Sequence, residues 1–278
     1  MTATGRITTD RAIVLARGLG TRMRAADATA TLTDTQRRAA DAGLKAMMPI
    51  AGRPFLDYVL SALADAEVRD VALVCAPDHA LLRRHYERDS PPTRLRLSFV
   101  VQPEPLGTAD AVLAVEEWAG ADAFLALNAD NLYPAGVLRA LGQQAEPAFP
   151  AFRRGELVRS GNIRDEQVQA FALVELDVDG YLARIVEKPP PEMLARAGDA
   201  ALLSMNCWRF DRRIFQACHD VPRSARGEFE LPQAVMLAVE RGVRFRAVPA
   251  SGAVLDLSRR GDAIEITRRL ATTVTPRP

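Results

Sequence analysis

Cysteine and histidine are scarce in this sequence, and neither shows the spacing of a metal site or a disulfide framework. The chain has three residues of each type among 278. Cys75, Cys207 and Cys218 form no Cys-x-x-Cys pair and each lies in an apolar setting, so we predict buried free thiols. The histidines lack the His-Glu-x-x-His spacing of zinc hydrolases. We therefore look for chemistry that needs neither residue.

A strong net charge and a long hydrophobic run are also missing. The formal net charge is +1, which gives no general attraction to nucleic acid or to an anionic membrane. No uncharged apolar run approaches the roughly 20 residues of a membrane span, and the first residues contain no apolar signal region. We expect a cytoplasmic enzyme or binding protein without nucleic-acid or membrane partners.

Short apolar runs alternate with amphipathic stretches along the chain. The patterns predict strands and helices in the order strand 11–16, helix 54–66, strand 71–76, strand 95–102, helix 108–119 and strand 123–129. Residues 168–189 predict two strands joined at a turn. They are followed by strand 202–210, helix 231–242, strands 243–250 and 253–258, and helix 261–273. This alternation favours an α/β fold with a mostly parallel sheet and helices on both faces.

Unusual polar groups follow several of the predicted strands. Gly18 and Gly20, after the first strand, allow the backbone to approach a ligand closely, and Arg22 suits phosphate oxygens. A tight strand-to-helix turn with solvated arginines is the alternative. Ligands of doubly wound sheets bind at the carboxyl ends of the strands, where these groups would meet.

Two aspartates and two lysines stand out in the same way. Asp130 and Asp256 each follow an apolar run, where a single aspartate is commonly a helix cap. As a pair beside a phosphate loop, they are typical of Mg²⁺ ligands. Lys45 and Lys188 are either solvated or two cationic sites for a pair of phosphorylated substrates.

These motifs, in this order, resemble the sugar-1-phosphate nucleotidyltransferases, also called nucleoside-diphosphate-sugar pyrophosphorylases. The resemblance is carried by GLGTRM, the segment from Lys45 to Pro54, Gln102 with Gly107-Thr108-Ala109, Asp130, Glu187-Lys188-Pro189 and Asp256, and it spans about residues 11–270. It implies a single domain over residues 1–278 with a Rossmann-like, doubly wound mixed sheet of the GT-A-like kind. Residues 11–130 would be the nucleotide-binding half, and residues 131–278 would be the sugar-phosphate-binding half, with a smaller sugar-binding subregion.

The resemblance also implies roles for individual residues. Arg22 and Lys45 would act on the phosphates, Asp130 and Asp256 would hold Mg²⁺, and a nucleoside triphosphate and a sugar 1-phosphate would be the substrates. The sugar phosphate would contact Glu187, Lys188 and Asn206. The nucleotide would contact Leu15, Ala16, Gly18, Gly20, Thr21, Gln102, Gly107 and Thr108. A homo-oligomer is left open.

The sequence departs from the family pattern in two places. Arg17 stands where the family usually has a small residue, and 22 residues separate Arg22 from Lys45, more than in the family. We expect the excess, residues 27–43, to form a lid over the nucleotide. A fixed surface or subunit-contact helix is the alternative.

Other functions remain open on the sequence alone. A nucleotide-sugar-dependent glycosyltransferase would normally carry an Asp-x-Asp metal pair, whereas Asp130 is followed by Asn131 and Leu132. A nucleotidyltransferase for a non-sugar phosphate and a non-catalytic regulatory homologue are the further alternatives. Neither the nucleobase nor the sugar is identified.

Overall fold

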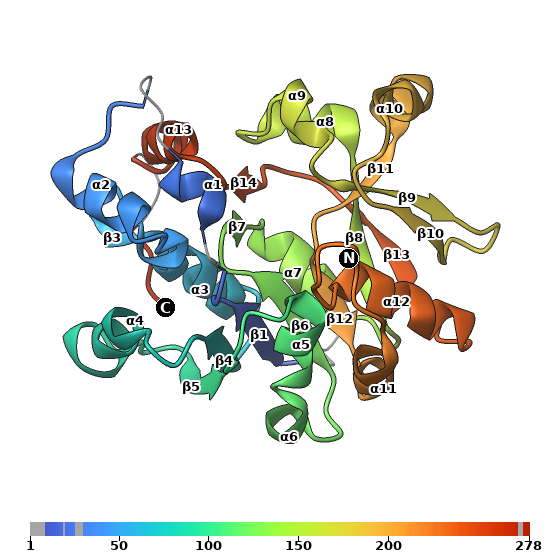
Figure 1. The fold of residues 1–278 in the computed structure, drawn as a ribbon, viewed down its shortest axis with the longest axis horizontal. Coiled ribbons are helices and arrows are strands. Elements are labelled where there is room, and N and C mark those ends of the chain that lie inside the picture. The colour runs from blue at the N-terminus through green and yellow to red at the C-terminus, as the bar shows by residue number, and fades with distance from the viewer. Residues whose placement is uncertain (1–8, 19, 26–29, 272–274) are drawn as a thin grey trace, which may run out of the picture.

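The centre of the molecule is a ten-stranded sheet whose first four strands in chain order are parallel (Figure 1). The computed structural model describes residues 9–18, 20–25, 30–271 and 275–278. The parallel strands are β1 (Arg11–Leu15), β4 (Asp70–Cys75), β5 (Arg96–Val101) and β6 (Phe124–Asn128). All four were predicted, and they lie in the order β5-β4-β1-β6. The order reverses direction at β1 and β6, and such a switch point opens a crevice at the carboxyl ends of the strands.

The other half of the sheet is mostly antiparallel, so the predicted α/β fold is confirmed as a mixed sheet. Its strands are β8 (Ala148–Arg153), β9 (Ala172–Leu176), β10 (Leu182–Val186), β11 (Leu202–Ser204), β12 (Trp208–Phe210) and β13 (Arg246–Ala250), the last parallel to β8. The sequence did not predict β8, because Pro150 stands inside it and proline is unusual within strands.

The strand predicted at 202–210 is wrong in one respect, because it is interrupted between β11 and β12. Asn206 lies in the interruption with φ of 59°, in the left-handed region that a strand cannot accommodate. The helix predicted at 108–119 is likewise divided, into α5 (Thr108–Leu113) and α6 (Glu116–Ala119). Both corrections add turns that a hydrophobic pattern does not register.

Two small antiparallel pairs lie beside the main sheet. β2 (Pro49–Ile50) pairs with β3 (Arg53–Pro54), and β7 (Asn131–Leu132) pairs with β14 (Leu255–Asp256). The second pair sets Asp256 opposite Asn131. Segments 125 residues apart in sequence thus meet at one edge of the crevice.

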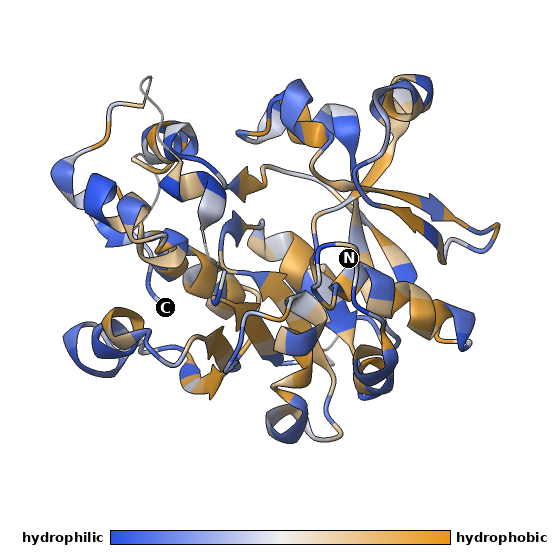
Figure 2. Cartoon of the chain, viewed as in Figure 1, coloured by the Kyte–Doolittle hydropathy of each residue, from blue (hydrophilic) through white to orange (hydrophobic). Residues whose placement is uncertain are grey.

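Helices cover both faces of the parallel half because β1 is apolar on both sides. Ala12 and Val14 pack into the core that contains α3 (Phe55–Asp65), whereas Ile13 packs into the core that contains α5 and α12 (Leu231–Glu240). Hydrophobic colour follows the strands and the helix faces that meet them, and outward-facing turns are hydrophilic (Figure 2). Each large apolar side chain buried in this way stabilises the fold by about 1.5–3 kcal/mol.

The remaining helices connect the strands and close the ends of the sheet. They are α1 (Thr21–Arg24), α2 (Asp34–Asp41), α4 (Ala80–Arg84), α7 (Ala135–Gly142), α8 (Arg154–Ser160), α9 (Asp165–Val168), α10 (Pro191–Ala197), α11 (Arg213–Asp220) and α13 (Arg260–Leu270), with short turns η1 (Lys45–Met47), η2 (His85–Asp89) and η3 (Gly198–Ala200). In the part of the chain that the structure describes, none of the helices is long and apolar enough to cross a membrane.

The segment predicted as a lid contains α2, which is anchored at both ends. The Thr33 side chain and Gln36 form a capping box, and Gln36 Nε2 donates to the carbonyl of Pro49 at 2.9 Å. Asp41 accepts from Arg260 Nη2 at 2.6 Å. Residues 27–29 of the predicted lid lie outside the described residues. For 34–41 these contacts favour the alternative, a fixed surface helix.

The cysteine prediction is confirmed. Cys75, Cys207 and Cys218 are buried free thiols. Burial raises the pKa of Cys218 to about 12 and raises the pKa of Cys207 as well, so neither is a thiolate at neutral pH.

Candidate functional site

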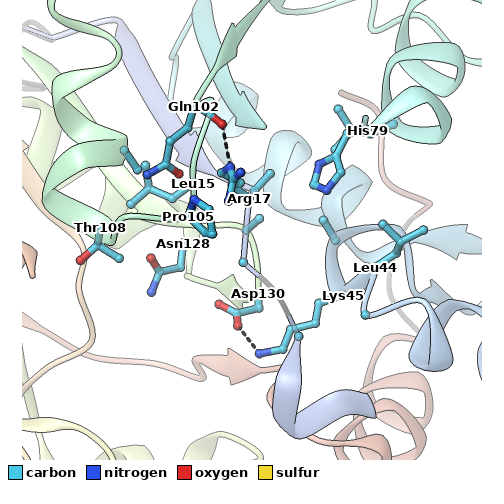
Figure 3. Close-up of a pocket in the computed structure, with 18 of the residues that line it drawn as sticks. Leu15, Arg17, Leu44, Lys45, His79, Gln102, Pro105, Thr108, Asn128 and Asp130 are labelled. Atoms are coloured by element: carbon cyan, nitrogen blue, oxygen red, sulfur yellow. Dashed lines mark hydrogen bonds and ion pairs between the residues drawn. The ribbon is translucent and has the colours of Figure 1, made fainter. Parts of the chain in front are cut away.

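A cavity of about 360 Å³ opens at the carboxyl ends of β1, β5 and β6, at the switch point of the sheet (Figure 3). We call it the first cavity. The residues expected to contact a nucleotide all line it: Leu15, Ala16, Gly18, Gly20, Thr21, Gln102, Gly107 and Thr108. The structure therefore brings together groups from two segments, 15–21 and 102–108, that are far apart in the sequence.

The two glycines of the first loop serve different purposes. Gly20 has φ of 61°, and a Cβ on it would lie 2.4 Å from the carbonyl oxygen of Gly43, so no other residue fits there. Nothing lies within 4 Å of a Cβ built on Gly18. Gly20 thus packs the loop against the segment that leads to Lys45, and Gly18 leaves room at the cavity wall.

Gln102 and Gly107 form the opposite wall through tight local bonding. The Gln102 amide Nε2 donates to the carbonyl of Gly107 at 3.0 Å and to Asp110 Oδ2 at 2.6 Å. Gly107 has φ of 117° and packs directly on the backbone of Phe229. Because both bonds use its nitrogen, Gln102 has only its side-chain oxygen left for a ligand.

Arg17 and His79 also line the first cavity, although no role there was predicted for either residue. Arg17 donates from Nε to the carbonyl of Gln102 at 2.6 Å and from Nη2 to that of Pro103 at 2.8 Å, so it fastens the loop after β5 (Figure 3). His79 Nδ1 is buried and has no hydrogen-bond partner among the described residues. Burial lowers the pKa of His79, which keeps the ring neutral.

A second cavity, of about 390 Å³, adjoins the first. Arg22, Glu187, Asn206 and Asp256 line this second cavity. Seven residues line both cavities, and we call them the shared wall: Gly18, Gly20, Thr21, Lys45, Thr108, Asn128 and Asp130. The two cavities therefore meet at the glycine loop and the Lys45–Asp130 pair.

Lys45 and Asp130 form an ion pair in the shared wall, with Nζ 2.8 Å from Oδ2 (Figure 3). Both side chains are mostly covered, at 18% and 24% exposure. Asp130 is fixed from behind, because its carbonyl accepts from the backbone N–H of Leu257 at 2.8 Å. This bond follows the β7–β14 pair and brings Asp256 next to Asp130.

Asp256 is a buried carboxylate beside another carboxylate. It is 6% exposed, and Oδ1 accepts from Asn131 Nδ2 at 2.9 Å. Burial and the negative charge of Asp130 raise the pKa of Asp256 to about 7. The described residues hold no cluster of three or more His, Cys, Asp and Glu side chains suited to a metal ion. Asp130 and Asp256 are two neighbouring carboxylates at the meeting point of the cavities.

Three other predicted residues differ in their surroundings. Arg22 is exposed and has no hydrogen-bond or ion-pair partner among the described residues. Loss of surrounding water and the nearby charge of Glu230 raise the pKa of Glu187, which lines the second cavity. Lys188 is exposed, has φ of 46°, and lines neither cavity. The structure thus gathers every predicted site residue around the two cavities except Lys188.

Glu187 and Asn206 were predicted, but three other residues that line the second cavity from the second half of the chain were not. Ser204 and Trp208 come from β11 and β12, and Glu230 precedes α12. Asn128 could have been found, because it ends β6 at the same sheet edge as Asp130. For Ser204 and Trp208 the sequence offered no signal, since they are ordinary strand residues.

The chain matches a known protein family over nearly its whole length. A sequence model of the family described as nucleotidyl transferase matches residues 11–270. A glucose-1-phosphate thymidylyltransferase from Streptomyces antibioticus is 27% identical over 96% of this chain and 68% of the relative. A UTP–glucose-1-phosphate uridylyltransferase from Haloferax volcanii is 27% identical over 94% of this chain and 96% of the relative.

Solved structures show the same fold. A UDP-glucose pyrophosphorylase complexed with UDP-glucose superposes with a TM-score of 0.74 at 18% identity, covering 96% of this chain and 100% of the other. A UTP-bound UGPase from Acinetobacter baumannii superposes with a TM-score of 0.70 at 19% identity, covering 94% and 93% of the two chains.

Proposed function

This chain belongs to the nucleotidyl transferase family, and we propose that it transfers a nucleotidyl group from a nucleoside triphosphate to a sugar 1-phosphate. The products would be a nucleoside-diphosphate sugar and pyrophosphate. The named activities of the relatives support this reaction, since they are thymidylyl and uridylyl transfer to glucose 1-phosphate.

The single observation that carries the proposal is the shared wall. Two cavities of similar size, about 360 and 390 Å³, meet at a glycine loop and the Lys45–Asp130 pair. A reaction between two phosphorylated substrates needs their phosphates to meet, while the base and the sugar are held apart. Two cavities that join at a wall of backbone and charged groups fit this requirement.

The residues of the shared wall suit a reaction that needs no general base. An oxygen of a sugar 1-phosphate is already anionic, so it can attack the α-phosphorus in line. Catalysis is then positioning and stabilisation of the charge that develops on the departing pyrophosphate. Arg22 is suited to that stabilisation, because its guanidinium has no partner among the described residues. The ion pair with Asp130 holds Lys45 in the wall where the two phosphates would meet.

Mg²⁺ is the metal that this donor set would fit. Mg²⁺ is usually held by one or two carboxylates together with substrate phosphates, which matches Asp130 and Asp256. Burial of Asp256 beside a second carboxylate disfavours its ionised form, and a bound divalent cation would stabilise that form. The bound ion would supply charge neutralisation at the α-phosphate.

The function is tested with a matrix of nucleoside triphosphates and sugar 1-phosphates in Mg²⁺, scored by pyrophosphate release. UTP and dTTP with glucose 1-phosphate are the first pairs, and phosphocholine serves as a non-sugar acceptor. We expect release that requires both a triphosphate and a sugar phosphate. If pyrophosphate were released with phosphocholine as the acceptor but with none of the sugar 1-phosphates, the substrate class would be non-sugar phosphates. Formation of free nucleoside diphosphate from a nucleotide sugar would indicate a glycosyltransferase instead.

The domain organisation, the cellular location and the oligomeric state of the chain are also predictions. We propose a single domain over the whole chain, supported by a sheet that extends from β1 to β13 across both halves. The cytoplasmic location and any homo-oligomer are expectations that a fractionation experiment and a mass measurement in solution would test.

A further inference from the structure

Three side chains form a hydrogen-bonded chain that runs from the buried core to the shared wall. The indole Nε1 of Trp208 donates to Asn206 Oδ1 at 2.9 Å, and Asn206 Nδ2 donates to Asn128 Oδ1 at 3.2 Å. Trp208 is completely buried, whereas Asn128 lines both cavities. We call these three residues the amide relay.

The donor and acceptor roles in the relay follow from chemistry rather than from observed hydrogens. An indole N–H can only donate, so the Asn206 atom facing Trp208 must be its oxygen. Asn206 therefore presents its NH₂ to Asn128, and the Asn128 atom that accepts must be oxygen. One donor buried in the core thus fixes the orientation of two amides.

The NH₂ group of Asn128 is available to donate to a ligand in the cavities. Asn128 Nδ2 has no hydrogen-bond partner among the described residues, and the side chain ends at the wall where the cavities meet. In the view of Figure 3 the amide appears between Thr108 and Asp130. In the same wall, one N–H of the Lys45 ammonium is engaged by Asp130, so the Asn128 NH₂ is a donor without a protein partner among the described residues.

Resting on the proposed function, we propose that Trp208 and Asn206 are positioning residues that hold Asn128 as a donor to a phosphoryl oxygen of the reacting substrates. If the side-chain amide of Asn128 rotated by half a turn, its oxygen would face the anionic phosphates, and the two groups would repel each other. The relay prevents this, because turning Asn128 would set its NH₂ against the NH₂ of Asn206.

The backbone at Asn206 is adapted to this task. Its φ of 59° interrupts the strand and directs the side chain toward Asn128 rather than along the strand. Asparagine is among the few non-glycine residues that adopt this conformation without large strain. Glycine adopts it more readily still, so Asn206→Gly removes the amide while keeping the backbone.

The primary test compares three variants by steady-state kinetics with the best substrate pair from the matrix. Asn128→Ala should lower kcat by about tenfold or more, since it removes a donor to a charged group. Asn206→Gly should lower kcat several-fold, because Asn128 is then free to turn. In the Asn128→Ala background, Asn206→Gly should have no further effect. An Asn206→Gly effect of the same size in both backgrounds would overturn the proposal.

A second comparison separates positioning from stability. Asn206→Gly leaves the buried Trp208 Nε1 without an acceptor and should lower the melting temperature. Adding Trp208→Phe removes that unpaired donor, so the double variant should regain part of the melting temperature but keep the reduced kcat. Recovery of kcat together with the melting temperature would mean a purely structural role. Trp118→Phe, at the other tryptophan of the chain, is the matched control and should leave kcat unchanged.

Failure of the proposed function gives a different result. In that case the unaltered chain releases no pyrophosphate with any pair of the matrix, and the relay is tested by calorimetric binding of UDP-glucose. Asn206→Gly should weaken that binding several-fold in the unaltered chain but not in Asn128→Ala. Equal affinities for the unaltered chain and Asn206→Gly would overturn the relay independently of turnover.

Discussion

The two cavities are built from different kinds of secondary structure. The first cavity takes its residues from loops that directly follow the parallel strands β1, β5 and β6. The second takes many of its residues from the antiparallel half, where Asn206 stands in an interrupted strand and Glu187 follows β10. Parallel strands deliver polar groups to one sheet edge automatically, whereas antiparallel strands must be interrupted or ended to do so.

This difference affects how each cavity should respond to amino-acid substitutions. In the first cavity, Gln102 and Thr108 bond to neighbouring backbone, with Thr108 Oγ1 accepting from the N–H of Leu231 at 2.9 Å. In the second, Asn206 is held mainly by side chains, accepting from Trp208 and donating to Asn128. We expect substitutions at the shared wall to affect both substrates and those on one side to affect a single substrate.

The largest effect is expected at the shared wall itself. Asp130→Asn should lower kcat/KM by on the order of 10²-fold or more, because it removes a proposed Mg²⁺ ligand and the partner of Lys45. Chelation of Mg²⁺ should abolish turnover of the unaltered enzyme, and added Mg²⁺ should restore it.

Asp122→Asn is the control for this substitution. Asp122 is exposed and pairs with Arg11 far from the cavities, so its loss should leave turnover intact. Full activity of Asp130→Asn in Mg²⁺ would remove Asp130 from the metal site.

The next prediction distinguishes the role of Arg22 in the reaction from the role of Lys188 in binding the sugar phosphate. Arg22→Ala should mainly lower kcat, by about ten- to a hundredfold, because Arg22 would stabilise the departing pyrophosphate. Lys188→Ala should mainly raise the KM for the sugar 1-phosphate, by several-fold. Initial rates measured over both substrate concentrations give the two constants separately.

Lys188 is the weaker of these two assignments, because the side chain is exposed and lines neither cavity. Arg184→Ala, a loss of another exposed cation on β10, is its control. An unchanged KM for the sugar phosphate in Lys188→Ala would mean that the second cavity binds the phosphate without this lysine.

A smaller effect concerns stability and pH at the carboxylate pair. The pKa of Asp256 is raised from 3.8 to about 7, so the folded protein binds more protons than the unfolded chain between these values. The free energy of unfolding should therefore fall as the pH rises through this window, by about 1–4 kcal/mol. Asp256→Asn removes this contribution.

The measurement is denaturant unfolding of the metal-free protein and of Asp256→Asn from pH 5 to 8. The difference between the two curves isolates Asp256 from the other titrating groups. Parallel curves would show that Asp256 is ionised in the folded state across this range.

The sequence predicted the parallel half and its cavity better than the antiparallel half. β1, β4, β5 and β6 are short continuous apolar runs, and a polar group directly after such a run lies at a known sheet edge. That reasoning places Gln102 and Asp130 beside the glycine loop from the sequence alone, and both line the first cavity with it. Local sequence is sufficient there because the strand ends supply the geometry.

The antiparallel half was harder to predict from the sequence, because its geometry depends on contacts between distant segments. β8 was not predicted because it contains Pro150, and a hydrophobic pattern does not predict the left-handed turn at Asn206. Asp256 was identified by its polar character within an apolar run, but its position beside Asp130 depends on the β7–β14 pair. Residues such as Trp208, which act from inside the core, give no local signal.

The smallest effect is expected in α2, where a lid and a fixed helix predict different hydrogen exchange. The Gln36 bond to Pro49 and the Asp41 pair with Arg260 hold α2 against β2 and α13, which line neither the first nor the second cavity. Amides of residues 34–41 should therefore exchange at nearly the same rate with and without nucleotide and Mg²⁺. Thr21, in the shared wall, lies in α1 and should gain protection in the same experiment. Arg260→Ala provides the sensitivity control, since loss of the anchor to Asp41 should speed exchange in α2. If nucleotide increased the protection of residues 34–41 in the unaltered chain, the lid prediction would be supported. α2 would then respond to binding of the nucleotide in the first cavity.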